Sequence, residues 1–278
     1  MNGQSQNPKR PWWMRVLRLL AIIVICYLVV VVVALCFENT LVYLPQGADS
    51  WSAKPHDQVE DIGIPTTDHG PIHAWWFPRT NPSNDRVVLY CHGNGGNLSH
   101  RGRHIVDMQN RLDGPGFLIF DYPGFGKSTG NLSEAGCYAG THAAYDWLVN
   151  TKQFDPSNII LLGESLGGGV AVELAMTKPC RKLVMCCTYT RIPDAAAHRF
   201  WWLPCRLLMR NRFDSVERIK SFQGQLLVVH GTLDKTIPFD QGQALYDAAT
   251  TPTKQFFRLD DARHCDYMDA AFLKELKK

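Results

Sequence analysis

The stretch Ile159-Ile160-Leu161-Leu162-Gly163-Glu164-Ser165-Leu166-Gly167-Gly168-Gly169 decides how this chain folds. An unbroken apolar run ends in Gly-x-Ser-x-Gly, and residues 170–176 continue with the spacing of a helix. A strand, a sharp corner and a helix are the context that makes this motif a nucleophile elbow. The motif alone is equally compatible with a glycine-rich turn that carries a solvated serine. The residues around the motif therefore have to distinguish a nucleophile elbow from such a turn.

The composition is that of a globular protein with a sizeable core. The chain has 278 residues, of which 45% are apolar and 20% are charged. This length accommodates one large domain and an appendage. The formal net charge is only +3, so no nucleic-acid partner is predicted.

The nine cysteines follow neither a metal-binding nor a disulfide pattern. No Cys-x-x-Cys is present, and two of the nine lie in an apolar N-terminal run. Cys91, Cys186 and Cys187 fall in or beside strand-like segments, where cysteine packs as a small hydrophobic residue. A disulfide framework is therefore not expected. A single bridge, for instance at Cys180 or Cys205, stays open.

The N-terminal region predicts a membrane anchor. Residues 1–11 are polar and are predicted to be disordered. Residues 19–37 carry no charge and form a run of about 19 residues, enough to cross a hydrocarbon core of about 30 Å. A cleaved signal peptide is the competing interpretation. Its apolar core is normally shorter and ends in small residues, unlike Leu35-Cys36-Phe37-Glu38.

The residues that flank this run predict its orientation. Four basic residues between positions 9 and 18 precede it and Glu38 follows it, which favours a cytoplasmic N-terminus. Trp12 and Trp13 suit the headgroup level on the first side, and Tyr43 suits it on the other. We therefore expect residues 1–40 to be a cytoplasmic N-terminus and a single transmembrane anchor. The rest of the chain would face the periplasm, the lumen or the exterior.

From residue 41 onward the pattern predicts one α/β domain, reached by a linker along the membrane surface at residues 41–55. Alternating stretches at residues 59–64 and 72–77 come first, as antiparallel edge strands would. Continuous apolar strands then alternate with amphipathic helices, which predicts a mostly parallel central sheet of about eight strands with helices on both faces. The later strands are expected at residues 87–91, 117–121, 159–163, 183–187, 226–231 and 255–259, and the helices at 98–112, 133–151, 166–177, 239–249 and 269–277.

Candidate catalytic side chains follow these strands, at the sheet edge where ligands of such folds bind. Ser165, Asp234 and His264 each come just after a strand, in the chain order that accompanies a nucleophile elbow. Acyl transfer needs such a nucleophile, a general base and an acid that orients the base. Asp260 or Asp261 could replace Asp234, although they share a short loop with the histidine and would need a tight reversal.

The loop at residues 92–97, after the first parallel strand, is expected to supply an oxyanion hole. One donor would be the backbone N–H of Asn94 and the other that of Leu166. The neighbouring glycines allow the loop to turn its amides inward. A flexible glycine loop is the alternative, and His92 is expected to be structural.

Two further patterns resemble ligand sites but fail on their spacing. Gly126-Lys127-Ser128 looks like the end of a phosphate loop, but a Walker A motif would require glycine at the position of Asp121. His100 and His104 have the i, i+4 spacing of metal ligands, yet no zincin glutamate lies between them and no third ligand is in sight. No cofactor and no metal is predicted.

Residues 188–215 interrupt the alternation and form a short cap-like insert. Phe200, Trp201 and Trp202 make its centre too apolar for a plain loop, and they are candidates for lining a substrate pocket. Two interpretations compete evenly. The insert packs over the sheet edge, or it is a lid that lines an apolar acyl pocket and leans on the membrane.

These motifs resemble the α/β-hydrolase superfamily over about residues 38–278. Within it they resemble the BEM46-like, membrane-anchored branch that includes hydrolases similar to alpha/beta hydrolase domain-containing proteins 13 and 17. The matching pieces are His92-Gly93-Asn94-Gly95-Gly96-Asn97, Asp121-Tyr122-Pro123-Gly124-Phe125-Gly126-Lys127-Ser128, Gly163-Glu164-Ser165-Leu166-Gly167-Gly168 and His230-Gly231-Thr232-Leu233-Asp234.

The resemblance implies Ser165 as nucleophile, Asp234 as acid and His264 as base, with the amides of Asn94 and Leu166 as oxyanion hole. The chain departs from the family after the histidine, where Cys265 replaces a frequent asparagine. The family acts on esters and thioesters of lipids or acylated proteins.

The sequence therefore predicts a membrane-anchored serine hydrolase that cleaves a carboxylic ester or thioester through an acyl-enzyme. Its partners would be the lipid bilayer and a small acyl-ester, lipid or acylated-protein substrate, and its oligomeric state is not fixed by the sequence. A serine peptidase of the prolyl-oligopeptidase-like type is one alternative, against which the lack of a filtering domain counts. A non-catalytic binding protein of the same fold is the other.

Overall fold

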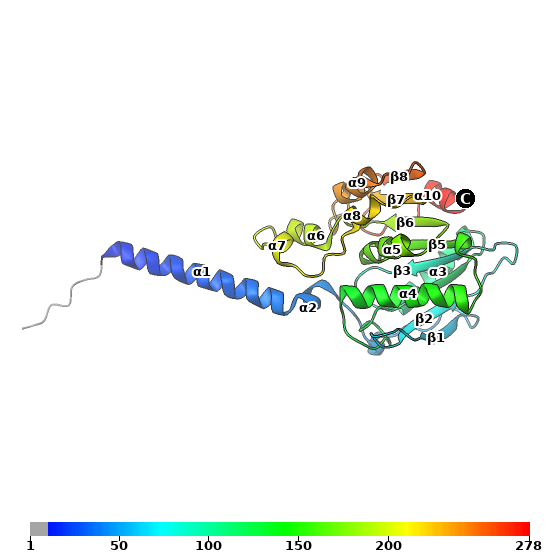
Figure 1. Ribbon diagram of the computed structural model, residues 1–278, viewed down its shortest axis with the longest axis horizontal. Helices are drawn as coiled ribbons and strands as arrows, with labels where there is room; N and C mark the ends of the chain where they lie inside the picture. Colours follow the sequence, from blue (N-terminus) through cyan, green and yellow to red (C-terminus); the bar gives the residue numbers. More distant parts are fainter. Residues whose placement is uncertain (1–10) are drawn as a thin grey trace, which may run out of the picture.

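The computed structural model describes residues 11–278, so the predicted disorder of residues 1–10 lies outside the described residues. One sheet has the strand order β1-β2-β4-β3-β5-β6-β7-β8 (Figure 1). β2 runs antiparallel to β1 and β4, and the other neighbours are parallel. The strands are β1 Glu60–Ile64, β2 Ile72–Phe77, β3 Val87–Cys91, β4 Gly116–Phe120, β5 Ile159–Glu164, β6 Lys182–Cys186, β7 Gln225–Gly231 and β8 Lys254–Leu259.

Helices cover both faces of this sheet, which confirms the predicted fold class (Figure 1). Side chains of α4, α5, α8 and α9 join the core cluster on one face, and those of α3 and α10 join the cluster on the other. The α-helices are α1 Trp12–Cys36, α2 Glu38–Val42, α3 Gly102–Arg111, α4 Glu134–Asn150, α5 Leu166–Thr177, α6 Ile192–Arg199, α7 Cys205–Leu208, α8 Ser215–Ile219, α9 Phe239–Ala248 and α10 Ala270–Leu276.

The central strands are buried on both faces because their side chains alternate between two hydrophobic clusters. In β3, Val87 and Leu89 point into one cluster, and Val88 and Tyr90 point into the other. The same is true of β2, which the sequence placed at the edge of the sheet. That placement is wrong, because β1 lies outside β2 and only β1 is exposed there.

The elbow between β5 and α5 depends on two backbones that approach closely. A Cβ atom at Gly167 would lie 1.9 Å from the carbonyl oxygen of Cys91 in β3. A Cβ atom at Gly163 would lie 2.5 Å from the carbonyl oxygen of Gly167. Glycine is therefore required at both positions, and the start of α5 packs directly against the ends of β3 and β5.

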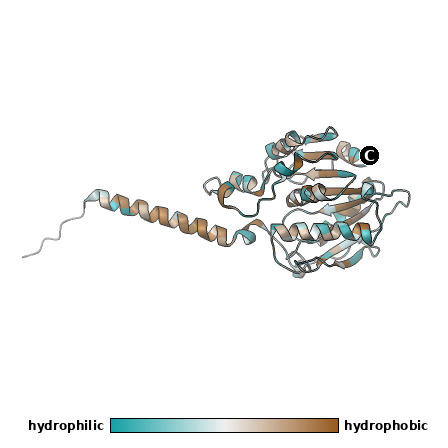
Figure 2. Cartoon of the chain, viewed as in Figure 1, coloured by the Kyte–Doolittle hydropathy of each residue, from teal (hydrophilic) through white to brown (hydrophobic). Residues whose placement is uncertain are grey.

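The helix α1 extends away from the domain (Figure 1). Within residues 11–278 it is the one helix long and apolar enough to cross a membrane, and only 6% of its most apolar 18-residue stretch is buried. Figure 2 shows it hydrophobic over most of its length. It begins at Trp12, earlier than the uncharged run, because Arg15 and Arg18 continue the same helix.

The segment after α1 packs on the domain, so the prediction of a plain linker is wrong, while its course along a membrane surface stays a prediction. Pro45 and Gly47 form parallel bridges with Gly96 and Gly126. Tyr43 is only 1% exposed, and its hydroxyl donates a hydrogen bond of 2.7 Å to Asn211 Oδ1. Its predicted place at the headgroup level is therefore also wrong, because the core buries its ring and the asparagine satisfies its hydroxyl.

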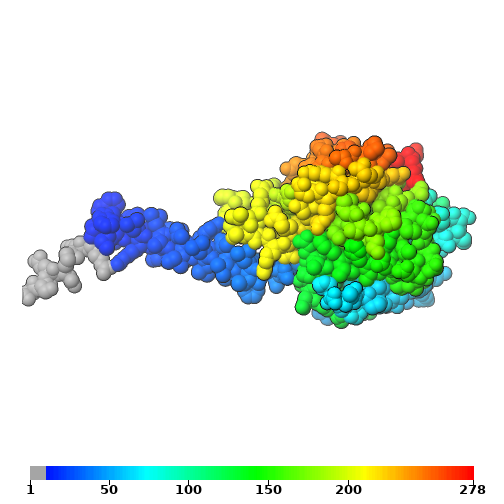
Figure 3. All heavy atoms as spheres, viewed as in Figure 1, coloured from blue at the N-terminus to red at the C-terminus, as the bar shows by residue number. Residues whose placement is uncertain are grey.

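The insert at residues 188–215 forms α6 and α7 and lies beside the end of α1. Figure 3 shows its yellow atoms along the blue end of that helix. The Tyr27 hydroxyl of α1 donates a hydrogen bond of 2.9 Å to the carbonyl oxygen of Trp202. We call residues 192–209 the lid.

Replacing Gly167 with alanine is expected to lower the free energy of unfolding by about 3 kcal/mol, because the new Cβ overlaps a backbone oxygen that cannot move aside. For a domain of this size the melting temperature Tm would fall by roughly 6–12 °C. Thermal unfolding of the full chain in detergent, followed by circular dichroism, measures it.

Gly63→Ala is the matched control, because no atom lies within 4 Å of a Cβ at that position. Its Tm is expected to stay within about 2 °C of the parent. Equal Tm values for the two variants would contradict the close approach at the elbow.

Candidate active site

Ser165 occupies the corner between β5 and α5 in a strained backbone conformation. Its φ of 51° and ψ of −114° cost about 1–3 kcal/mol for a residue other than glycine. Two hydrogen bonds hold it there. The Ser165 amide donates to the carbonyl oxygen of Cys186 at 2.9 Å, and the Thr188 hydroxyl donates to the carbonyl oxygen of Ser165 at 2.8 Å. The end of β6 therefore fixes the serine.

The structure brings Ser165, His264 and Asp234 together at the carboxyl edge of the sheet. The Ser165 hydroxyl donates to His264 Nε2 at 3.1 Å. His264 Nδ1–H donates to Asp234 Oδ2 at 2.7 Å. The three side chains follow β5, β7 and β8, so their contact depends on the register of the whole sheet.

Asp234 is held by its own loop and by two histidines. Its Oδ1 accepts hydrogen bonds from the amides of Thr236 and Ile237, at 2.8 and 2.9 Å, and His230 Nε2 lies 3.3 Å from Oδ2. Burial alone would raise the pKa of the Asp234 carboxyl, but the hydrogen bonds from His230 and His264 outweigh it and lower the pKa. The carboxylate is therefore ionised at neutral pH.

The other candidate acids lie elsewhere. Asp260 is exposed, and its carboxylate accepts a hydrogen bond from Arg258. Asp261 is also exposed, and its backbone amide donates to the Thr232 hydroxyl. The carboxylate that contacts His264 is that of Asp234.

The protonation of His264 follows from these contacts. Burial lowers the pKa of its imidazole, but the hydrogen bond to Asp234 outweighs burial and raises the pKa above the ordinary value. Above this pKa the ring is neutral, the carboxylate keeps the remaining proton on Nδ1, and the Nε2 lone pair faces the Ser165 hydroxyl. A ring in this state accepts a proton from the serine.

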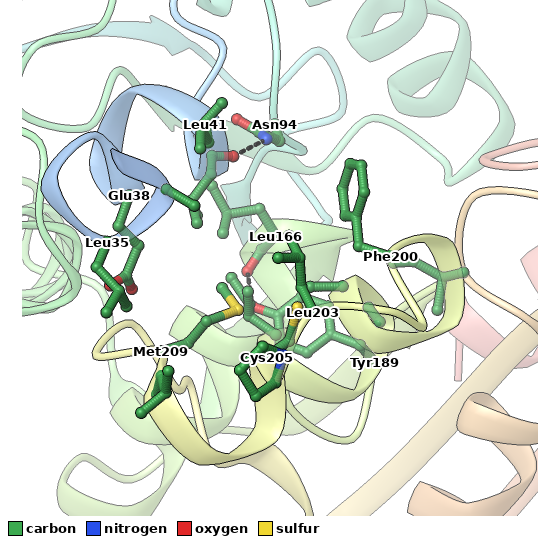
Figure 4. A pocket seen from close by; sticks show the side chains of 18 of the residues that line it. Leu35, Glu38, Leu41, Asn94, Leu166, Tyr189, Phe200, Leu203, Cys205 and Met209 are labelled. Atoms are coloured by element: carbon green, nitrogen blue, oxygen red, sulfur yellow. Dashed lines mark hydrogen bonds between the residues drawn. The ribbon is translucent and has the colours of Figure 1, made fainter. Parts of the chain in front are cut away.

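Asn94 and Leu166 line the same cavity as Ser165, where the oxyanion hole was expected (Figure 4). Leu166 is the first residue of α5, where backbone amides lack partners within the helix and the helix dipole is positive. The side chain of Asn94 is engaged in hydrogen bonds to the segment after α1. Its Oδ1 accepts from the Leu44 amide at 3.0 Å, and its Nδ2 donates to the carbonyl oxygen of Val42 at 2.5 Å.

A cavity of about 440 Å³ extends from Ser165 between the lid and the end of α1. Its lining is overwhelmingly apolar. Phe200 and Trp202 belong to it, as the sequence predicted, but Trp201 does not line it and is 82% exposed. That part of the prediction is wrong because Trp201 sits in the turn after α6 and faces outward. The other lid residues of the wall are Ile192, Ala195, Ala196, Leu203, Pro204, Cys205, Leu208 and Met209.

Sequence reasoning missed a buried carboxylate beneath the elbow. Glu164 Oε2 accepts hydrogen bonds from the Tyr90 hydroxyl at 2.7 Å and the Tyr267 hydroxyl at 2.8 Å. Tyr267 follows His264 in the chain, so Glu164 ties the histidine loop to β3. The available signal was a charged residue at the end of an otherwise apolar strand.

Among the described residues, the potential metal ligands that cluster are Cys187, His264 and Cys265, whose ligand atoms lie within 4.8 Å of one another. Cys187 Sγ donates to Cys265 Sγ at 3.0 Å. Burial raises the pKa of the Cys187 thiol to about 11, so the sulfur atom that a metal would need as a thiolate is protonated. A metal here would also occupy the imidazole that contacts Ser165.

The other candidate ligands have separate partners. His100 Nε2 contacts the carbonyl oxygen of Ser50 at 2.8 Å, and His104 Nε2 contacts the Tyr267 hydroxyl at 3.2 Å. Cys180 and Cys205, the positions at which a bridge was left open, are both free thiols.

Known proteins share both sequence and fold with this chain. The family described as "alpha/beta hydrolase fold" matches residues 86–216. The uncharacterized protein Rv2307c of Mycobacterium tuberculosis is 34% identical over 218 residues, 78% of this chain and 77% of that protein. Alpha/beta hydrolase domain-containing protein 17C of Xenopus tropicalis is 28% identical over 239 residues, 85% of this chain and 74% of that protein.

Among solved structures, the esterase Pf2001 of Pyrococcus furiosus matches with a TM-score of 0.66 at 21% identity, covering 84% of this chain and 95% of that chain. An alpha-beta serine hydrolase homologue from Coxiella burnetii matches with a TM-score of 0.56 at 19% identity, covering 82% and 96%. At these identities the likeness shows the fold. Together with the sequence relatives, it establishes that the chain belongs to the α/β-hydrolase superfamily, with relatives of the domain-containing protein 17 type.

Proposed function

We propose that this chain is a membrane-anchored serine hydrolase that cleaves a carboxylic ester or thioester through an acyl-enzyme at Ser165. The observation that carries the proposal is the pair of hydrogen bonds that joins Ser165 to His264 at 3.1 Å and His264 to Asp234 at 2.7 Å. A nucleophile, a base and an acid in this order are the parts that acyl transfer requires.

In the proposed reaction, Ser165 Oγ attacks the carbonyl carbon while His264 Nε2 takes its proton. Asp234 keeps the imidazole in the correct tautomer and stabilises the imidazolium that forms. The amides of Asn94 and Leu166 stabilise the oxyanion of the tetrahedral intermediate. The imidazolium then protonates the leaving alcohol or thiol. Water, activated by the same base, releases the acid and restores the serine.

The cavity favours an acyl group as the substrate part that the protein recognises. Its walls are apolar side chains of the lid and α1, which match a hydrocarbon chain better than the polar backbone of a peptide. Pf2001, which shares the fold, is an esterase. An ester or thioester with an apolar acyl chain therefore agrees with the site better than a peptide does.

The anchor supports a reaction at a membrane surface. α1 has the length and composition of a single span, and the charges around it favour a cytoplasmic N-terminus with the domain on the periplasmic, lumenal or extracellular side. Exposed apolar side chains surround the end of α1 on the domain, as a surface that rests on lipid would require. They are Phe37, Leu41, Leu44, Trp201 and Leu207.

The full chain in detergent is expected to hydrolyse p-nitrophenyl esters, and Ser165→Ala is expected to lower kcat by about 10⁶ because the nucleophile is lost. Across an ester series, kcat/KM should rise roughly fourfold for each added CH₂ until the cavity is full, since each buried CH₂ contributes about 0.8 kcal/mol.

Ser83→Ala is the control and should leave the rates unchanged, because this exposed serine precedes β3, at the edge of the sheet opposite to the site. Faster turnover of a matched anilide than of any ester would favour a peptidase. Failure of a fluorophosphonate to label Ser165 in the folded chain would favour a binding protein.

The rate of fluorophosphonate labelling is expected to fall as the pH drops through the pKa of His264. The neutral ring is the active base, so activity is present above this pKa and lost below it. Because the hydrogen bond to Asp234 raises the pKa, the midpoint should lie above the ordinary histidine value of about 6.5. A midpoint below that value would contradict the hydrogen bond between His264 and an ionised Asp234.

Asp234→Asn is expected to slow labelling by about 10⁴, because the amide no longer stabilises the required tautomer and imidazolium. Asp260→Asn and Asp261→Asn are matched controls, since both carboxylates are exposed and lie away from His264. They should change the rate less than twofold. An equal loss in one of these controls would move the orienting acid to that residue.

A further inference from the structure

One face of the end of α1 and the start of α2 is withdrawn from the surface. Val31, Ala34, Leu35 and Glu38 are buried or half-buried, with the i, i+3, i+4, i+7 spacing of a single helical face. The residues between them stay exposed: Val32, Val33, Cys36 and Phe37. The helix is apolar all round, so this division comes from packing and not from the sequence.

That face forms part of the cavity that begins at Ser165. Val31, Ala34 and Leu35 line it opposite the lid, and Ser165 and Leu166 line its inner end. In Figure 4 Leu35 and Glu38, on the blue helical segment, lie across from the lid residues Met209 and Cys205. The membrane helix and the catalytic serine therefore share one apolar space.

The position of this wall is fixed by polar contacts. The Glu38 carboxylate is buried and accepts hydrogen bonds from the amides of Arg210 and Asn211, at 2.9 and 2.7 Å. Burial would raise its pKa, but the hydrogen bonds from Asn211 and Arg210 lower it, so the group is charged. Tyr27 adds its bond to Trp202 one turn before Val31. Tyr27 thus ties α1 to the lid, and Glu38 ties the start of α2 to the residues that follow the lid.

The length of α1 places this wall at the membrane boundary. The helix has 25 residues, which corresponds to about 37 Å at 1.5 Å per residue, whereas a hydrocarbon core needs about 20 residues. Arg15 and Arg18 stay at the first interface and the uncharged run of residues 19–37 crosses the core, so Val31, Ala34 and Leu35 lie within about 9 Å of its far end. The wall then stands where lipid chains meet their headgroups, and the ester bond of a lipid lies at that level.

We propose that Val31, Ala34 and Leu35 of the membrane helix determine the acyl-chain specificity of Ser165, by forming one wall of the site that holds the chain of a bilayer-resident ester. The inference rests on the proposed hydrolase function and adds its substrate class. An acyl chain in this site leaves the bilayer along α1 and reaches the serine without crossing water.

The test compares full-chain variants in detergent, with p-nitrophenyl butyrate, laurate and palmitate as probes. Ala34→Phe puts a ring into the cavity, and we expect the laurate-to-butyrate ratio of kcat/KM to fall at least about tenfold, with butyrate within about threefold of the parent. Leu35→Ala enlarges the cavity and is expected to raise the palmitate-to-laurate ratio about threefold. Val33→Phe and Val32→Ala are the matched controls on the exposed face, and should leave both ratios within about twofold.

Three outcomes would count against the proposal. Equal ratios in Ala34→Phe and Val33→Phe would show that α1 does not border the chain. An equal loss of laurate and butyrate turnover in Ala34→Phe, with no gain in Leu35→Ala, would show that the helix only positions the lid. If the parent hydrolysed neither ester, the proposed reaction itself would be overturned, and the acyl site with it.

Discussion

The strained backbone of Ser165 is the constraint on which the rest of the structure depends. With φ at 51°, the serine points its hydroxyl out of the sheet, but nothing local favours that conformation. It persists because Cys186 at the end of β6 binds the serine amide and Thr188 binds its carbonyl. In addition, α5 packs onto the carbonyl of Cys91, where only glycine fits at position 167. These contacts form only if β3, β5 and β6 keep their register. The apolar core on both faces of the sheet fixes that register, and with it the backbone conformation of Ser165.

The same constraint explains how distant parts of the chain meet at one edge. Asp234 and His264 reach Ser165 because β7 and β8 extend the parallel sheet next to β6. Glu164, one residue before the serine, binds two tyrosine hydroxyls and so ties the histidine loop to the core. On the other side, the Asn94 side chain binds the segment that follows α1. The loop that holds Asn94 is thus joined by direct hydrogen bonds to residues 42 and 44.

The fold could be predicted from the sequence because a sheet that is buried on both faces has a simple sequence pattern. Continuous apolar strands alternate with amphipathic helices. The positions of Ser165, Asp234 and His264 could be predicted from the same pattern, since each lies in the turn or loop that follows a strand. The predicted strand boundaries differ little from those of the structure: β4 and β6, for example, begin one residue earlier than expected. The helix expected at residues 98–112 begins as a short 3-10 turn before α3.

What the sequence could not supply are contacts that depend on packing between segments. Tyr43 looks like an interfacial residue, but Asn211 gives it a buried partner. Trp201 and Trp202 are adjacent and chemically alike, and only the turn after α6 separates one from the cavity. The buried face of α1 leaves no trace in a uniformly apolar run. The contact of Cys187 with Cys265 joins two loops of unpredictable shape.

The most direct test of the central claim is to trap the acyl-enzyme. The full chain is mixed with a p-nitrophenyl ester, quenched in acid within the first turnovers, digested and analysed by mass spectrometry. The account predicts the mass of the acyl group on the peptide that contains Ser165, and its loss from that peptide in Ser165→Ala. Ester consumption with the acyl group on another residue, or with none on the chain, would contradict it.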